Sequence, residues 1–216
     1  RSEWSILKFF AELFFKKATS SVKKKGKAMT KKIMIVGVGG QGTLLASRIL
    51  GNTVIGEGYD VKVSEVHGMS QRGGSVVTYV RFGDKVYSPI VDKGEADYII
   101  SFEKLEAARY AAFLKKGGKI IVNSQEIDPM PVITGAAEYP HEALEHLSSL
   151  GVDVDCIDAL TPALEAGSAK ATNIVLMGRL SKSLDIDKDK WIAALKESVA
   201  PKFVEMNIKA FELGRA

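Results

Sequence analysis

Residues 32–50 read KIMIVGVGGQGTLLASRIL, and this stretch sets the fold class. The apolar run at 32–38 predicts a buried strand, and residues 43–58 predict a helix because their apolar positions recur at helical spacing. The glycines between them satisfy the G-x-G-x-x-G spacing of a turn that joins a strand to a helix. A second strand is predicted at 59–66, so the segment predicts a Rossmann-like beta-alpha-beta unit.

The same alternation continues toward the C-terminus. Residues 75–82 and 85–91 flank the turn pair Gly83 and Asp84, which predicts a hairpin inside an otherwise parallel sheet. Two lysines and two glycines at 115–118 predict the end of a helix. The other predicted elements are strands at 96–102, 119–124 and 151–159, a helix at 103–114, and C-terminal helices at 168–184 and 188–216, broken near Pro201. Together they predict a single α/β domain of three layers, a mostly parallel sheet with helices on both faces.

Residues 1–28 differ from the rest of the chain in composition. They combine an apolar stripe at helical spacing with eight Lys or Arg and two Glu, a local charge of +6 within a total of +4. The stripe is too short and too charged to span a bilayer, and its lysines follow the apolar residues, unlike those of a secretory signal. Three interpretations stay open: a docking helix, a basic membrane-surface helix, or a segment outside the native domain. The domain itself is expected at 29–216.

Charge and cysteine content exclude several classes of function. Residues 29–216 carry a net charge of −2, so the domain lacks the basic surface that nucleic acid binding requires. The only cysteine is Cys156, and one thiol makes neither an internal disulfide nor a cysteine-ligated cluster. We expect a packed or unreactive thiol in a strand. This cysteine usage predicts the reducing cytoplasm, and membrane binding is not expected of the domain.

The glycine-rich turn is the first candidate binding site. Its glycines permit a tight turn and let an anion approach the free N–H groups at the start of the next helix. A dinucleotide would also need a carboxylate about 20 residues further on, at the end of the second strand. Asp60 lies 23 residues from Gly37 but at the beginning of that strand, and Glu65, near its end, lies 28 residues from Gly37, so a dinucleotide fits poorly. A phosphate-bearing ligand and simple strand–helix packing remain open. The candidate residues are Gly37, Gly39, Gly40, Gln41, Gly42 and Thr43.

Residues 64–83, SEVHGMSQRGGSVVTYVRFG, contain the second candidate site. Neither helix nor strand periodicity explains residues 67–74. Arg72 beside Gly73 offers a guanidinium group to a carboxylate or phosphate of a ligand or a neighbouring chain, or else closes its own loop by bonding to carbonyl groups. His67 has no nucleophile or acid pair beside it in the sequence, so we expect it to be structural.

The two motifs, in this order, identify a family resemblance. GVGGQGTLLASRIL followed by SEVHGMSQRGGSVVTYVRFG resembles the gamma-type domain of the 2-oxoacid:ferredoxin oxidoreductases. HGMSQRGG is similar to the version in beta subunits of the indolepyruvate branch, whereas pyruvate-type members carry a Gly-Pro-Glu-Arg-Arg-Gly-Gly-like loop. KATNIVLMGRL and NIKAFELG near the C-terminus are also similar to the family. The resemblance runs from about Met29 to Gly214 and leaves out residues 1–28.

The resemblance implies a complex in which a larger subunit carries thiamine diphosphate, magnesium and iron–sulfur clusters of the 4Fe–4S type. Such a complex decarboxylates an aryl pyruvate, transfers the acyl group to coenzyme A and reduces ferredoxin. This chain would be an accessory subunit that binds no cofactor alone, in an assembly with two copies of each subunit. Coenzyme A phosphates or the larger subunit would meet the glycine-rich turn and Arg72. The alternatives are a gamma subunit of a pyruvate-type or other 2-oxoacid-type enzyme, a free-standing dinucleotide-binding oxidoreductase, and a membrane-recruited module built on residues 1–28.

Overall fold

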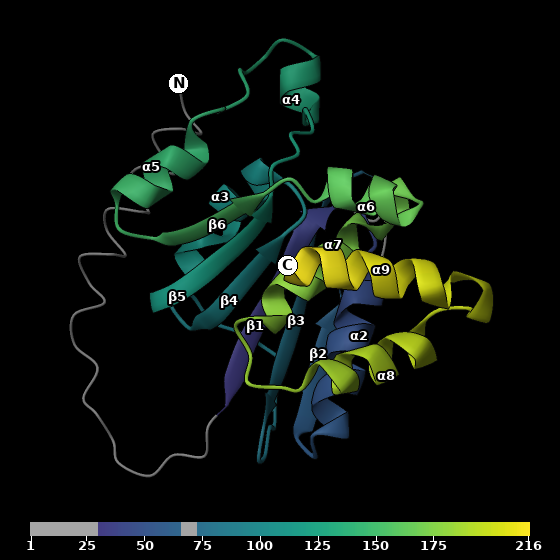
Figure 1. Ribbon diagram of the computed structural model, residues 1–216. Helices are drawn as coiled ribbons and strands as arrows, with labels where there is room; N and C mark the ends of the chain where they lie inside the picture. Colours follow the sequence, from purple (N-terminus) through teal and green to yellow (C-terminus); the bar gives the residue numbers. More distant parts are fainter. Residues whose placement is uncertain (1–29, 66–72) are drawn as a thin grey trace.

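The computed structural model of the protein describes residues 30–65 and 73–216. The apolar stripe of residues 1–28, His67 and Arg72 lie outside the described residues. In the described part, the strands form a six-stranded sheet in the order β2-β3-β1-β4-β5-β6, with helices on both faces (Figure 1). The strands are β1 (Lys31–Val38), β2 (Asp60–Glu65), β3 (Ser75–Gly83), β4 (Ala96–Ser101), β5 (Leu114–Asn123) and β6 (Asp153–Ile157).

Helices connect the parallel strands and cover the sheet. Within the described ranges, none of them is long and apolar enough to cross a membrane. The helices are α2 (Thr43–Gly56), α3 (Lys104–Tyr110), α4 (Met130–Ile133), α5 (Ala143–Ser149), α6 (Leu160–Ala166), α7 (Thr172–Ser181), α8 (Lys188–Ser198) and α9 (Val204–Arg215).

The central strand β1 separates two hydrophobic cores. Ile33 and Ile35 pack with α2, α7, α8 and α9 on one face, whereas Met34 and Val36 pack with α3 and α5 on the other. All four side chains are fully buried. Because successive strand residues point to opposite faces, an unbroken apolar run belongs to a strand that is covered on both sides. The predicted three-layer α/β architecture is confirmed.

Strand β3 lies between the two strands of the first β-α-β unit. It pairs antiparallel with both β1 and β2, so β1 and β2 run in the same direction without touching. The antiparallel strand at residues 75–82 was predicted, but the prediction that it forms a hairpin with residues 85–91 was wrong. Since β2 and β1 occupy both edges of β3, no edge is left for residues 85–91, which follow an irregular path.

The lysine–glycine run at 115–118 also differs from its prediction. It lies inside β5, because α3 passes through a 3-10 turn (Ala111–Phe113) and β5 begins at Leu114. The pairing of β4 with β5 shifts register in this region. A Cβ on Gly118 would lie 3.0 Å from the carbonyl oxygen of Ala96. The glycines therefore allow a bulge in the strand rather than ending a helix.

The C-terminal helices cover the face of the sheet that also carries α2. Helices α7 and α9 cross with their backbones in contact, since a Cβ on Gly178 would lie 2.1 Å from the Phe211 carbonyl oxygen. A Cβ on Gly214 would lie 2.0 Å from the Val175 carbonyl oxygen. The predicted break near Pro201 is confirmed, because a 3-10 turn at Pro201–Phe203 separates α8 from α9.

Candidate functional site

The glycine-rich turn lies at the carboxyl edge of the sheet, where β1 and β4 end side by side. Helix α2 follows β1 onto one face of the sheet, and α3 follows β4 onto the other. Neighbouring parallel strands whose helices go to opposite faces define a topological switch point, and open α/β sheets bind ligands outside the strand ends there. The turn thus occupies the position at which this fold class binds its ligands.

The side chain of Gln41 spans this switch point. Its Oε1 accepts a hydrogen bond from the Val38 N–H at 2.7 Å. Its Nε2 donates to the Phe102 carbonyl oxygen and to Gln125 Oε1, each at 3.2 Å. Phe102 directly follows β4 and Gln125 lies just beyond β5, so one amide group joins the ends of three strands. Gln41 therefore fixes the positions of these strand ends relative to one another through internal bonds.

The glycines of the turn meet different structural requirements. Gly37 is buried at the end of β1, and a Cβ there would lie 2.7 Å from Gln41 Oε1. Gly40 and Gly42 have φ angles of 100° and 87°, in the left-handed region that favours glycine. A Cβ on Gly42 would also lie 2.5 Å from Asn173 Nδ2 of α7. Gly40 is exposed and has open space around it, so solvent or a ligand reaches the turn at this residue.

Helix α2 begins directly after the turn without a side-chain cap. Its N-cap, Gly42, accepts hydrogen bonds on its carbonyl oxygen from the Ala46 N–H and from Asn173 Nδ2, each at 3.2 Å. In the described part of the chain, the N–H groups of residues 42–45 have no hydrogen-bond partner. The first turn of α2 also carries no acidic residue. Unpaired N–H groups at the positive end of the helix dipole suit an anion near Thr43.

The two sequence motifs meet at this edge of the sheet. The Gly39 N–H donates to the Gly74 carbonyl oxygen at 2.8 Å, which joins the glycine-rich turn to the end of the 67–74 stretch. Gly73 is exposed and has a φ angle of 97°. Arg72, the remaining candidate, lies outside the described residues, so its role stays a prediction.

The residues that flank 66–72 are tied to different helices. Ser47 of α2 donates to Glu65 Oε1 at 2.7 Å. Ser75 donates to Glu106 of α3 at 2.5 Å, and Arg109 Nη1 donates to the same carboxylate at 2.7 Å. Burial raises the pKa of Glu106 above its ordinary value, although both partners favour the ionised form. The first residue of β3 is thus held by the buried carboxylate of Glu106, which lies on α3, on the opposite face of the sheet from α2.

A second buried carboxylate, Glu103, organises the loops after β4 and β5. It is the N-cap of α3 and accepts the Glu106 N–H at 2.8 Å. The Tyr139 hydroxyl donates to Glu103 Oε1 and accepts the Leu105 N–H at 3.2 Å. The Ile127 N–H donates to the same Oε1 at 3.3 Å. Burial raises the pKa of Tyr139, and the bond to the Glu103 carboxylate raises it further.

Cys156 lies in β6 as predicted, but it is exposed rather than packed. Partial desolvation raises the pKa of its thiol despite the positive charge of Lys104, and a thiol with a raised pKa is a poor nucleophile. Among residues 30–65 and 73–216, no group of three or more His, Cys, Asp or Glu side chains is placed to hold a metal ion. A cluster of the 4Fe–4S type requires four cysteine thiolates, and Cys156 is the only cysteine of the chain.

The structure adds residues to the site that reasoning from the sequence missed. Phe102 and Gln125 contact the turn from the ends of β4 and β5, and Asn173 contacts it from α7. Phe102 and Gln125 could have been found from the sequence, because residues just after a parallel strand lie at the edge where this fold class binds ligands. Asn173 lies within KATNIVLMGRL, one of the segments that carry the family resemblance.

Comparison with known sequences identifies the relatives of this chain. The family model described as "Pyruvate ferredoxin/flavodoxin oxidoreductase" matches residues 32–216. A Thermococcus kodakarensis protein named "Indolepyruvate oxidoreductase subunit IorB" is 44% identical over 189 residues, which cover 84% of this chain and 93% of that protein. A Pyrococcus horikoshii protein with the same name is 45% identical over 190 residues, with the same shares.

Solved structures share the fold at lower sequence identity. The gamma subunit of a keto/oxoacid ferredoxin oxidoreductase from Geobacter sulfurreducens superimposes with a TM-score of 0.62 at 24% identity, covering 85% of this chain and 95% of that chain. A 2-oxoglutarate:ferredoxin oxidoreductase from Magnetococcus marinus gives a TM-score of 0.67 at 19% identity, covering 88% of this chain but 31% of that chain. With the family model matched over nearly the whole described domain, the chain belongs to the pyruvate ferredoxin/flavodoxin oxidoreductase family.

Proposed function

We propose that this chain is the accessory subunit of an indolepyruvate:ferredoxin oxidoreductase. The observation that carries the proposal is the identity of 40–45% to three proteins named as indolepyruvate oxidoreductase subunits, each covered over more than nine-tenths of its length. Identity to the common gamma subunits of pyruvate/ketoisovalerate oxidoreductases is 28%. The aryl pyruvate enzyme is therefore favoured over the pyruvate-type alternative.

The proposal assigns the redox chemistry to a larger subunit. Thiamine diphosphate, its magnesium ion and the iron–sulfur clusters belong to that subunit, and the described residues of this chain offer no fitting ligand set. The assembled enzyme would decarboxylate the 2-oxoacid, form acyl-CoA and reduce ferredoxin, in the cytoplasm and with two copies of each subunit. This chain would contribute binding surface and shape at the interface.

A free-standing dinucleotide-binding oxidoreductase is disfavoured by the state of both candidate carboxylates. Glu65 at the end of β2 accepts a hydrogen bond from Ser47. Asp60 lies at the opposite end of β2, where it bonds to Lys62 Nζ at 2.7 Å and to the Val86 N–H at 3.0 Å. Asp60 therefore lies away from the glycine-rich turn, and one oxygen of Glu65 is already bonded to α2, so neither matches a carboxylate held ready for the hydroxyl groups of a ribose.

For the turn itself we propose a coenzyme A phosphate as the ligand. The N–H groups at the start of α2, which have no partner among residues 30–65 and 73–216, support a bound phosphate, as do the absence of an acidic residue in the first turn of α2 and the open approach at Gly40. Gly37, Gly39, Gln41 and Gly42 would shape the turn, and Thr43, Gly73 and Arg72 would lie beside the phosphate. The larger subunit would complete the site.

Leu44→Glu tests the ligand, because Leu44 is exposed in the first turn of α2. A carboxylate at this position interacts favourably with the helix dipole but repels a phosphate. We expect the KM for coenzyme A of the assembled enzyme to rise about tenfold, with an unchanged melting temperature and an unchanged KM for the 2-oxoacid. Leu44→Gln and Ile55→Glu, at the other end of α2, are the controls and should behave like the wild type. An unchanged KM for coenzyme A in Leu44→Glu would remove the phosphate from this site.

A further inference from the structure

Residues 128–138 project from the carboxyl edge of the sheet, between β5 and α5. They include α4, which stands apart from the other helices in Figure 1. Every one of these residues is exposed or half-buried, and α4 has no buried residue. Long connections of this kind are uncommon in compact domains unless they have a function. We call residues 128–138 the α4 knuckle.

The α4 knuckle has a defined shape although it makes no hydrogen bond to the rest of the described chain. Pro129 begins the helix, and its carbonyl oxygen accepts the Val132 and Ile133 N–H groups at 2.9 and 3.1 Å. The Thr134 N–H and hydroxyl both donate to the Met130 carbonyl oxygen, each at 2.9 Å. The backbone therefore satisfies itself locally, which leaves the side chains free to face outward.

A single buried carboxylate holds both ends of the knuckle. Glu103 accepts the Ile127 N–H just before it and the Tyr139 hydroxyl just after it. Glu126 adds a bond from Lys104 Nζ at 3.0 Å and one to His141 Nδ1 at 2.8 Å. The knuckle is thus a preformed projection on a fixed base, and preformed elements bind partners at a lower entropic cost.

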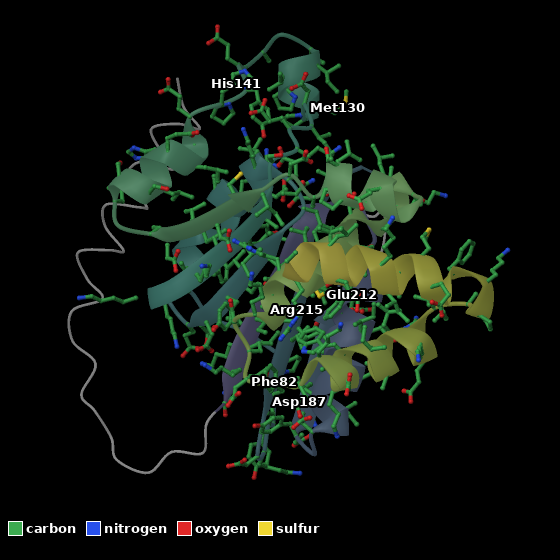
Figure 2. The ribbon with its side chains drawn as sticks, viewed as in Figure 1. Phe82, Met130, His141, Asp187, Glu212 and Arg215 are labelled. Atoms are coloured by element: carbon green, nitrogen blue, oxygen red, sulfur yellow. The ribbon has the colours of Figure 1, made fainter. Side chains whose placement is uncertain are left out.

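The knuckle has an apolar tip and acidic flanks. Met130 and Ile133 are 67% and 65% exposed, and no charged residue lies between Asp128 and Glu138. Figure 2 shows Met130 on α4 with His141 at the same end of the molecule. Residues 120–169 contain nine Asp or Glu and no Lys or Arg. Among the described residues, Glu126 pairs with Lys104 and His141, whereas Asp128 and Glu138 take part in no ion pair.

The charge and shape of the α4 knuckle indicate which kind of partner it binds. An anionic membrane or a nucleic acid is repelled by the acidic flanks, and a second copy of this chain would bring the same charges face to face. An apolar tip between acidic flanks complements a protein pocket that is apolar inside and basic at its rim. We propose that the α4 knuckle docks this chain onto the larger subunit of the oxidoreductase, in a pocket of this kind.

The choice of the larger subunit rests on the proposed function and on the relatives. The same fold makes up 31% of the Magnetococcus marinus chain, so there it adjoins other parts of one polypeptide. The curated relatives are named as subunits, and this chain covers 93% of the length of the two most similar to it among those described above. We therefore place the surface that receives the knuckle on another polypeptide. The knuckle begins three residues after Gln125, which contacts Gln41 of the glycine-rich turn. A subunit seated on the knuckle therefore lies beside the candidate ligand site.

The test measures binding of the full-length chain to the purified larger subunit by biolayer interferometry under anaerobic conditions. The variant Met130→Ser/Ile133→Ser should bind about 100-fold more weakly than the wild type, as expected when two central apolar side chains are lost. Ile55→Ser/Tyr87→Ser removes two side chains that are 57% and 88% exposed elsewhere, and it should bind within about twofold of the wild type. Equal affinity of the knuckle variant and the wild type would overturn the inference.

A charge variant tests the basic rim separately. Asp128→Lys/Glu138→Lys should bind about tenfold or more weakly at low salt, whereas Glu197→Lys/Glu205→Lys on α8 and α9 should not. Tighter binding of the knuckle lysine variant would contradict the basic rim. Binding of the wild-type knuckle to liposomes or to a second copy, lost in the serine variant, would overturn the choice of occupant. If the wild-type chain neither binds the larger subunit nor raises its activity, the proposed function fails rather than the assignment of the knuckle alone.

Discussion

Replacing Gln41 by alanine should destabilise the domain more than its partly exposed position suggests. The side chain makes three hydrogen bonds, to the Val38 N–H, the Phe102 carbonyl oxygen and Gln125. At about 1 kcal/mol for each bond, the loss is about 2–3 kcal/mol in the free energy of unfolding. For a domain of this size, that corresponds to a fall of about 4–12 °C in the melting temperature.

The matched control is Gln125→Ala. Gln125 is exposed and bonds through its side chain to Gln41 at 3.2 Å and to Asn123 at 3.4 Å, so its loss should cost about 0.5–1 kcal/mol. Urea unfolding of the wild type, both single variants and the double variant gives all four values. If Gln41→Ala costs no more than Gln125→Ala, the Gln41 amide does not hold the three strand ends together.

Three further predictions concern other contacts in the domain. Gly178→Ala should destabilise the domain by about 3 kcal/mol or more in chemical denaturation, since its Cβ would lie 2.1 Å from a carbonyl oxygen of α9. Gly51→Ala, in α2 with nothing within 4 Å, should be neutral or stabilising by up to about 1 kcal/mol, and equal effects would refute the close helix crossing. Tyr139→Phe should lower the free energy of unfolding by about 1–3 kcal/mol in the same assay, because it removes the bonds to Glu103 and to the Leu105 N–H. If this variant is as stable as the wild type, these bonds do not hold the base of the α4 knuckle. Burial raises the pKa of Glu106 in the folded protein above its ordinary value of 4.5, so the folded protein binds this proton more tightly than the unfolded chain does. The contribution of Glu106 to the free energy of unfolding is therefore largest below pH 4.5 and is lost as the pH rises through the folded pKa. Glu106→Gln should remove that slope in urea unfolding measured from pH 4 to pH 8, and an identical slope in both proteins would contradict the assignment.

The local elements of this fold were predictable because their signals are local. The apolar run of β1, the glycine spacing and the helical spacing of α2 lie in one stretch of 25 residues, from Lys32 to Gly56. Strand pairing was harder, since the partner of β3 depends on which strands occupy its edges. Residues 85–91 have a strand-like composition, yet β1 and β2 leave them no place beside β3.

The candidate site was likewise predictable in its local features but not in its long-range contacts. Its glycines were found from spacing alone, but the contacts that shape it join distant parts of the chain. Gln41 and Gln125 are separated by 84 residues, and Asn173 and Gly42 by 131. No pattern within one segment reveals such pairs. The prediction for the lysine–glycine run at 115–118 failed although its signal is local, because glycine is favoured both in a bulge inside a strand and at the end of a helix.

The central claim is that this chain acts as a subunit of an indolepyruvate oxidoreductase. The most direct measurement is anaerobic reconstitution of the larger subunit with and without this chain, with and without residues 1–28, followed by coenzyme A-dependent reduction of ferredoxin or viologen. We predict full activity only with both chains present, and faster turnover with indolepyruvate than with pyruvate. Full activity of the larger subunit alone would contradict the claim.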